Sequence, residues 1–132
     1  PKDVIVADDM KVGAKKRCIT VEHGVDVGYR IVDVGPETVK LFGKYITDAK
    51  MILWNGPMGA FEISEFACGT NDIARRVAYS EAVSIVGGGD SAAAVHQSGY
   101  ANRISHVSTG GGAALEFLSG NILPAVEVLD QM

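Results

Sequence analysis

Three glycine-rich segments, each directly after an apolar run, are the parts of this chain best suited to chemistry. They cover residues 51–59 (MILWNGPMG), 83–90 (VSIVGGGD) and 106–112 (HVSTGGG). Glycine leaves main-chain N–H groups open to a ligand, and a helix that begins behind such a segment adds unpaired donors and partial positive charge. Glycine also ends strands for steric reasons, so one segment alone would mean little. Three in series predict a phosphate-binding site.

Polar side chains beside these glycines extend the chemistry. Asp90 closes the second segment, where a carboxylate among backbone amides suits a phosphate only if a divalent cation bridges the two. We therefore expect a magnesium–phosphate site. Glu62 lies within reach of a hydroxyl pair such as that of a ribose, and Asn55 offers a neutral donor at a strand end. Asp90 is also a good helix N-cap, and the two roles are compatible.

The elements that must position these residues alternate downstream of Lys50. Strands are expected at about 51–54, 83–86 and 104–107, and helices at about 71–81, 91–97 and 113–118. Thr70 is a suitable N-cap, and Gly99 and Gly120 stand where glycines end helices. Alternating strands and helices are typical of a parallel sheet, and right-handed crossovers place all strand C-termini at one edge. The glycine segments are therefore expected to be neighbours.

The first 50 residues are less regular. We expect strands at 4–7 and 17–21 and a helix at 36–45, with irregular chain between them. The fold class is α/β, in three layers (α/β/α) around a mainly parallel sheet. Residues 1–132 are interpreted as one partial domain, divided into an irregular strand and helix region (1–50) and repeated strand, glycine loop and helix units (51–132).

Composition narrows the possible functions. The 132 residues are 47% hydrophobic and carry a formal net charge of -4, so no basic field favours nucleic acid. The two cysteines form neither a metal-ligand nor a disulfide pattern, which favours a reducing, cytoplasmic compartment. No apolar stretch approaches the ~20 residues of a membrane span. We expect neither a nucleic-acid nor a membrane partner.

Other known sites fit less well. No lysine lies in the three segments, which excludes a P-loop, and their glycine spacing does not match the dinucleotide fingerprint. A Rossmann-type dinucleotide binder is the alternative. The three histidines have no partner at a recognisable spacing, and His106 is interpreted as a core residue. Core packing is likewise favoured over base stacking for Trp54 and Phe61.

Four motifs carry a resemblance to a known family. They are residues 54–62 (WNGPMGAFE), 66–70 (FACGT), 87–91 (GGGDS) and 104–118 (ISHVSTGGGAALEFL). In this order and spacing they resemble phosphoglycerate kinase. The likeness extends through residues 4–8 (VIVAD), 33–38 (DVGPET) and 123–124 (LP), and so covers nearly the whole chain.

The resemblance implies an enzyme, a kinase of glycolysis, that transfers phosphate reversibly between 1,3-bisphosphoglycerate and ADP. The implied cofactor is ATP or ADP with Mg²⁺, bound to a Rossmann-like domain. Asp90 would serve the magnesium ion and Glu62 the ribose. The remaining nucleotide-binding residues implied are Asn55, Gly56, Pro57, Gly87, Gly88, Gly89 and Ser91. Gly110, Gly111 and Gly112 would donate N–H groups to the phosphoryl group in transit.

The resemblance covers only the later half of the family's C-terminal, nucleotide-binding domain. Binding of 3-phosphoglycerate would require an N-terminal domain that this chain lacks, so we expect the chain to be inactive alone. We also expect the strand at 51–54 to have an open edge and the strand at 4–7 to lack neighbours. Three outcomes are expected for these unpaired strands. The chain self-associates across the open edge, residues 4–7 dock against residues 51–54, or the N-terminal region is disordered. The alternative is a non-catalytic nucleotide- or phosphate-binding module.

Overall fold

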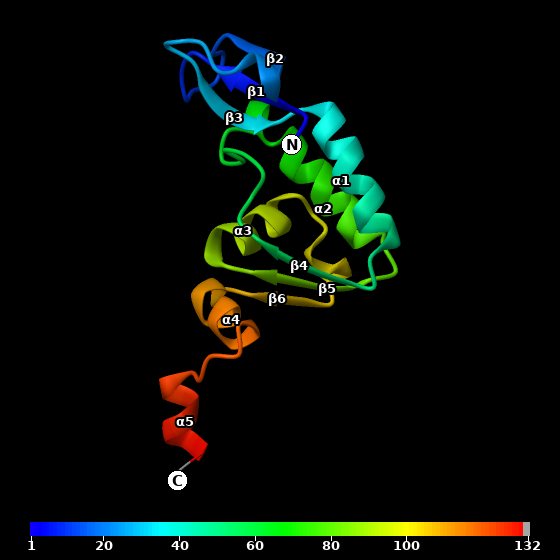
Figure 1. Ribbon diagram of the computed structural model, residues 1–132, viewed down its shortest axis with the longest axis vertical. Coiled ribbons are helices and arrows are strands. Elements are labelled where there is room, and N and C mark those ends of the chain that lie inside the picture. The colour runs from blue at the N-terminus through cyan, green and yellow to red at the C-terminus, as the bar shows by residue number, and fades with distance from the viewer. Residues whose placement is uncertain (131–132) are drawn as a thin grey trace.

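The computed structural model describes residues 1–130 and contains two three-stranded sheets with helices packed between and beside them (Figure 1). The strands are β1 (Asp3–Ala7), β2 (Lys16–Thr20), β3 (Arg30–Val34), β4 (Met51–Asn55), β5 (Val83–Gly87) and β6 (His106–Ser108). The helices are α1 (Pro36–Asp48), α2 (Cys68–Ala78), α3 (Gly89–Gln97), α4 (Gly111–Leu118) and α5 (Pro124–Asp130). Short 3₁₀ turns occupy Val21–His23, Ser64–Phe66 and Ala101–Arg103.

The second sheet confirms the expected α/β fold. Its strand order is β4-β5-β6, and both pairs are parallel. Met51 lies opposite Val83, and Ile85 lies opposite His106. All three strands therefore end at the same edge, and β4 has no partner on its outer side within the described residues.

The first sheet is antiparallel, with the order β2-β1-β3. The expectation of irregular chain before α1 was therefore wrong at β3, and so was the expectation that residues 4–7 lack neighbours. β1 hydrogen-bonds on both sides to strands that this chain itself supplies. It is neither disordered nor docked against β4. Val4, Val6 and Ile19 form the small core of this sheet.

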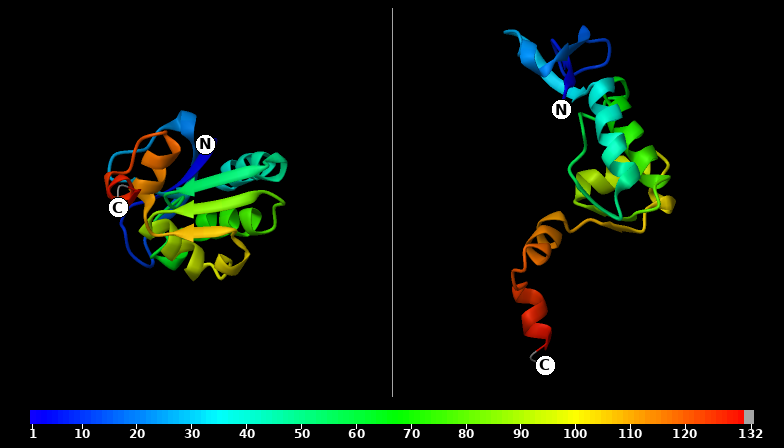
Figure 2. Two further views of the ribbon diagram at one scale, coloured as in Figure 1. Left: turned by 90° about the horizontal axis from the view of Figure 1, so that it is seen from below. Right: turned by 45° about the vertical axis from the view of Figure 1, so that its right-hand side comes forward.

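Helices α1, α2 and α3 cover one face of the parallel sheet (Figures 1 and 2). Trp54 and Val86 point into this layer and are buried among residues of the helices, as predicted for Trp54. Phe61 is also buried, in a smaller cluster with Ala67 and Ala94.

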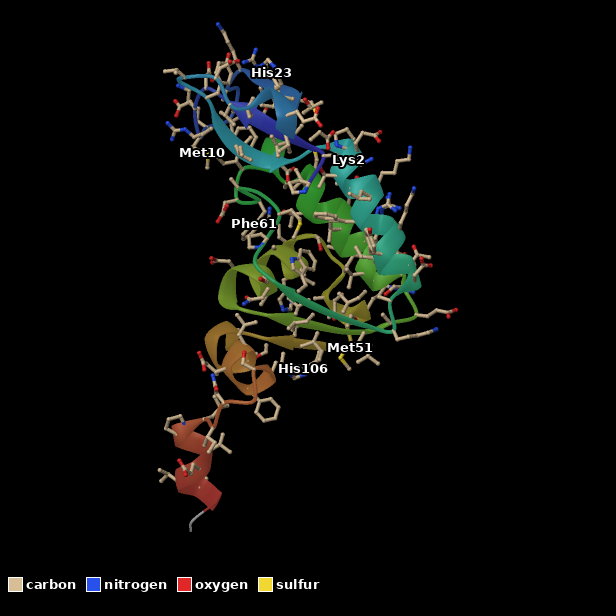
Figure 3. All side chains as sticks on the ribbon, viewed as in Figure 1. Lys2, Met10, His23, Met51, Phe61 and His106 are labelled. Carbon is tan, nitrogen blue, oxygen red and sulfur yellow. The ribbon has the colours of Figure 1, made fainter. Side chains whose placement is uncertain are left out.

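The opposite face of the parallel sheet is open along the strands, as the view from below shows (Figure 2). Met51, Leu53 and Val83 are 64%, 42% and 51% exposed. Met51 and His106 lie on this side of the sheet (Figure 3). His106 is exposed, so its interpretation as a core residue was wrong, because it lies on the face that no helix of residues 1–130 covers.

Several helix and strand boundaries differ from the sequence prediction. α2 begins at Cys68, so Thr70 is its third residue and fully buried rather than its N-cap. α3 and α4 begin at Gly89 and Gly111, earlier than predicted, because glycine conformations let each helix start inside its loop. Gly99 and Gly120 follow the ends of α3 and α4 with positive φ, as expected.

The C-terminal helix α5 projects away from the sheets (Figure 1). None of the helices within residues 1–130 has the length and apolar character needed to cross a membrane.

Candidate functional site

The three glycine segments meet at the C-terminal edge of the parallel sheet. A Cβ atom placed on Gly88 would lie 2.7 Å from Asn55 Oδ1, and one placed on Gly111 would lie 2.7 Å from Gly88 Cα. The loops after β4, β5 and β6 therefore touch through positions where only glycine fits. The predicted proximity of the three segments is confirmed.

Hydrogen bonds lock the loops together. Gly56 N–H donates to Ser91 Oγ at 2.6 Å, and Gly88 N–H donates to Ser108 O at 3.0 Å. Ser91 is only 1% exposed. Its hydroxyl therefore joins the first loop to α3 from inside the protein.

The start of α3 offers free backbone donors. Gly88 is the N-cap residue with φ of 102°, and the first bond of the helix runs from Ala92 N–H to Gly88 O. Within residues 1–130, the N–H groups of Gly89, Asp90 and Ser91 have no hydrogen-bond partner. Gly89 and Asp90 are exposed, whereas Ser91 is buried, so the first two donors, with the positive end of the helix dipole, can meet an anion.

The start of α4 differs from the prediction. Gly110 N–H donates to Ser108 Oγ and Gly111 N–H to Thr109 O, both at 3.1 Å. The expectation that all three glycines offer N–H groups was therefore wrong for Gly110 and Gly111, because the tight turn after β6 uses those donors itself. In the described part of the chain, Gly112 N–H is without a partner, and Gly111 instead provides the close approach to Gly88.

The two predicted carboxylates are both exposed. Asp90 lies in the first turn of α3 and makes no capping hydrogen bond, so its N-cap interpretation was wrong: Gly88 occupies the cap position. Glu62 follows the buried Phe61, whose carbonyl oxygen accepts a hydrogen bond from Gln97 Nε2 at 3.1 Å. Asp90 is thus part of α3, and Glu62 is held near α3 by the hydrogen bond between Gln97 and its neighbour Phe61.

Of the remaining predicted residues, Gly56 and Pro57 lie on the first loop and Gly87 ends β5. Gly56 and Pro57 are half-buried, and Gly56 has φ of 101°. Trp54 Nε1 donates to Gly56 O at 2.6 Å, which ties the loop to the buried end of β4. Gly87 is buried at the end of β5, beneath α4.

Sequence reasoning missed Asp33, a buried residue that contacts the first loop at Gly59. Asp33 on β3 is 1% exposed, and its Oδ2 accepts a hydrogen bond from Gly69 N–H at 2.7 Å. Burial raises the pKa of this carboxyl, although the hydrogen bonds from Gly69 and Val34 act in the opposite direction. A carboxylate within the apolar end of a strand, residues 31–34 (IVDV), is the signal that could have indicated it.

Comparisons with known proteins agree with this geometry. A sequence model of the family described as phosphoglycerate kinase matches residues 1–121. The phosphoglycerate kinase of Rubrobacter xylanophilus is 53% identical over 131 residues, and that of Herpetosiphon aurantiacus is 46% identical over 130 residues. These alignments take in 99% and 98% of this chain, and 33% of each relative.

Solved structures of phosphoglycerate kinases also superpose on this chain. Phosphoglycerate kinase from Coxiella burnetii superposes with a TM-score of 0.88 at 46% identity, over 99% of this chain and 33% of that one. The enzyme from Pyrococcus horikoshii OT3 superposes with a TM-score of 0.81 at 35% identity, over 98% of this chain and 32% of that one. The chain thus spans about a third of the length of these relatives, and it belongs to the phosphoglycerate kinase family.

Proposed function

We propose that this chain binds the phosphates of Mg-ATP or Mg-ADP and so supplies the nucleotide half of a phosphoryl-transfer site. The observation that carries the proposal is the meeting of the starts of α3 and α4 at one sheet edge, where the exposed Gly89, Asp90 and Gly112 have N–H groups without a partner among residues 1–130. Phosphoryl transfer depends mainly on positioning and charge stabilisation, which backbone donors provide.

The donor set fits a magnesium nucleotide. Bound Mg²⁺ would neutralise phosphate charge, and Asp90 is the exposed carboxylate at the helix start that would hold it. Within residues 1–130 no group of three His, Cys, Asp or Glu side chains is placed to hold a metal ion by itself. The ion would therefore bind jointly to Asp90 and to the phosphates.

The first loop would receive the nucleoside. Asn55, Gly56 and Pro57 line its start, and the exposed Glu62 would accept hydrogen bonds from the ribose hydroxyls. Gly87, Gly88 and Gly89 form the floor that lets the phosphates approach the main chain. Gly112 would meet the phosphoryl group in transit, with Gly110 and Gly111 shaping the turn that presents it.

The family indicates the reaction of the longer protein. Such an enzyme would transfer phosphate reversibly between 1,3-bisphosphoglycerate and ADP in the cytoplasm, with 3-phosphoglycerate bound outside the third of the protein that this chain represents. The three loops contain no Lys or Arg to neutralise the moving phosphoryl group. This chain alone therefore binds nucleotide without turnover.

Titration calorimetry and a coupled kinase assay test the proposal together. We expect Mg-ADP to bind weakly and NAD to bind no better, while the purified chain forms no ATP from 1,3-bisphosphoglycerate and ADP. Absence of any Mg-ADP binding, or tighter binding of NAD, would contradict the nucleotide-phosphate site. ATP formation in a preparation free of host enzyme would contradict the expected inactivity.

A further inference from the structure

Asp33 joins the antiparallel sheet to the start of α2. Its Oδ2 accepts from Gly69 N–H at 2.7 Å, and its Oδ1 accepts from Val34 N–H at 2.9 Å. The side chain is 1% exposed and lies 36 residues from Gly69 in the sequence. A buried carboxylate that accepts two main-chain hydrogen bonds fixes the relative position of the segments that donate them.

The same carboxylate supports the first glycine loop. A Cβ atom placed on Gly59 would lie 2.6 Å from Asp33 Oδ1 and 2.5 Å from Val32 O. The next residue, Ala60, donates its N–H to Val32 O at 2.9 Å. The loop therefore rests directly on Asp33 and the adjacent backbone of β3, with no space for a side chain between them.

A second attachment runs through α2. Thr70, next to Gly69, is fully buried, and its Oγ1 accepts a hydrogen bond from Met58 N–H at 3.2 Å. The hydrogen bond from Gly69 to Asp33 thus fixes the helical turn that holds Met58. Asp33 acts on the loop both by direct contact and through this turn.

Building on the proposed nucleotide site, we propose that Asp33 is a positioning residue that sets the nucleotide-binding geometry of residues 55–62. Its side chain is 1% exposed and so offers no surface to a ligand. Its carboxylate holds the back of the loop against β3 and α2, and so sets where Asn55, Pro57 and Glu62 lie relative to the starts of α3 and α4. Nucleotide affinity therefore depends on a side chain behind the site.

Asp33→Asn tests this with little change in volume, because it replaces one acceptor oxygen by an NH₂ group that faces an N–H donor. Trp54 is the only tryptophan of the chain, and its indole donates to Gly56 O, so its emission reports the loop. The matched control is Asp3→Asn, since Asp3 is also a buried carboxylate that accepts main-chain hydrogen bonds at a helix start, but at α1.

We expect Asp33→Asn to shift the ligand-free Trp54 emission and to weaken Mg-ADP binding by about tenfold, the size expected for one lost hydrogen bond to a charged group. Asp3→Asn should leave the Trp54 emission unchanged and the Mg-ADP affinity within about twofold of wild type, although it also removes a buried charge. Unchanged emission and affinity in Asp33→Asn would overturn the inference, and so would equal changes in both variants.

Gly59→Ala provides an independent variant should Asp33→Asn fail to fold. It keeps the carboxylate but forces the loop away from Asp33 and Val32, so the same emission shift and affinity loss are expected. Wild-type emission and affinity in Gly59→Ala would overturn the inference. Failure of the wild-type chain to bind Mg-ADP would instead contradict the proposed function, while the ligand-free emission still decides whether Asp33 sets the loop.

Discussion

At the scale of single residues, the site is built from the main chain more than from side chains. The Ser91 hydroxyl joins the first loop to α3, and Asn55 lies against Gly88, so both side chains contact the protein itself. Asp90 differs, because it is exposed in the first turn of α3 without a capping hydrogen bond. Its carboxylate is thus not needed to start the helix, which is compatible with the proposed magnesium role.

Asp90→Asn should therefore affect magnesium-dependent binding selectively. We expect the variant to bind Mg-ADP about tenfold more weakly, as for the loss of one charge-assisted contact, and to bind ADP without Mg²⁺ nearly as wild type does. Calorimetry in the presence of Mg²⁺ and of a chelator measures both affinities. Asp48→Asn, at the far end of α1, is the control for loss of one exposed carboxylate. An equal loss under both conditions would show that Asp90 is structural.

At the scale of elements, α1 and α2 begin without a side-chain cap of their own. The antiparallel sheet supplies the missing acceptors. Asp3 Oδ2 accepts from Glu37 N–H at 3.1 Å and Asp3 Oδ1 from Thr38 N–H at 2.7 Å, while Asp33 does the same for Gly69 at the start of α2. The small sheet therefore stabilises both helices that cover the parallel sheet.

The cap on α1 predicts a pH dependence of stability. Burial alone would raise the pKa of Asp3, but hydrogen bonds from Thr38 and Glu37 hold it below the ordinary value of 3.8. Because the folded pKa is lowered, the stabilisation is present above pH 3.8 and is lost as pH falls through the folded pKa. Asp3→Asn should cost about 1–2 kcal/mol at pH 7 and less in acid.

Urea unfolding between pH 7 and pH 3 measures this difference. Thr20→Ala, an exposed change on the neighbouring β2, controls for substitution in the same sheet. A cost of Asp3→Asn that stays constant down to the lowest pH would contradict the role of the carboxylate as a cap.

At the scale of the whole molecule, the parallel sheet is only half covered. Beside the open edge of β4 lies an apolar groove of about 300 Å³, whose lining includes Phe42, Tyr45 and Leu53. The open face carries Met51 and Val83, both more than half exposed. An unpaired strand edge beside apolar surface is an association site that monomers rarely expose.

We propose that the isolated chain pairs with a second copy through β4. Sedimentation at micromolar concentration should show a dimer, and Leu53→Lys should shift it to the monomer, because a lysine at the edge opposes strand pairing and apolar contact. Val27→Lys, a fully exposed position near the other sheet, should leave the dimer intact. A monomeric wild-type chain would contradict the proposal.

The sequence by itself determined the family, the parallel α/β fold and the meeting of the three glycine loops. These depend on local patterns: an apolar strand, the glycines that follow it, and the helix behind them. Such patterns lie within about ten residues of one another, and the crossover rule then brings the strand ends to one edge. The burial of Trp54 and Phe61 also followed from their apolar surface.

Only the tertiary structure decided which donors are free and what holds the loops. The donors of Gly110 and Gly111 are used by their own turn, and His106 is exposed because no helix in the described part of the chain covers its face. Asp3 and Asp33 cap helices whose first turns lie 35 and 36 residues away. A hydrogen bond across that separation leaves no local pattern, because it depends on how β1 and β3 pair and pack against α1 and α2.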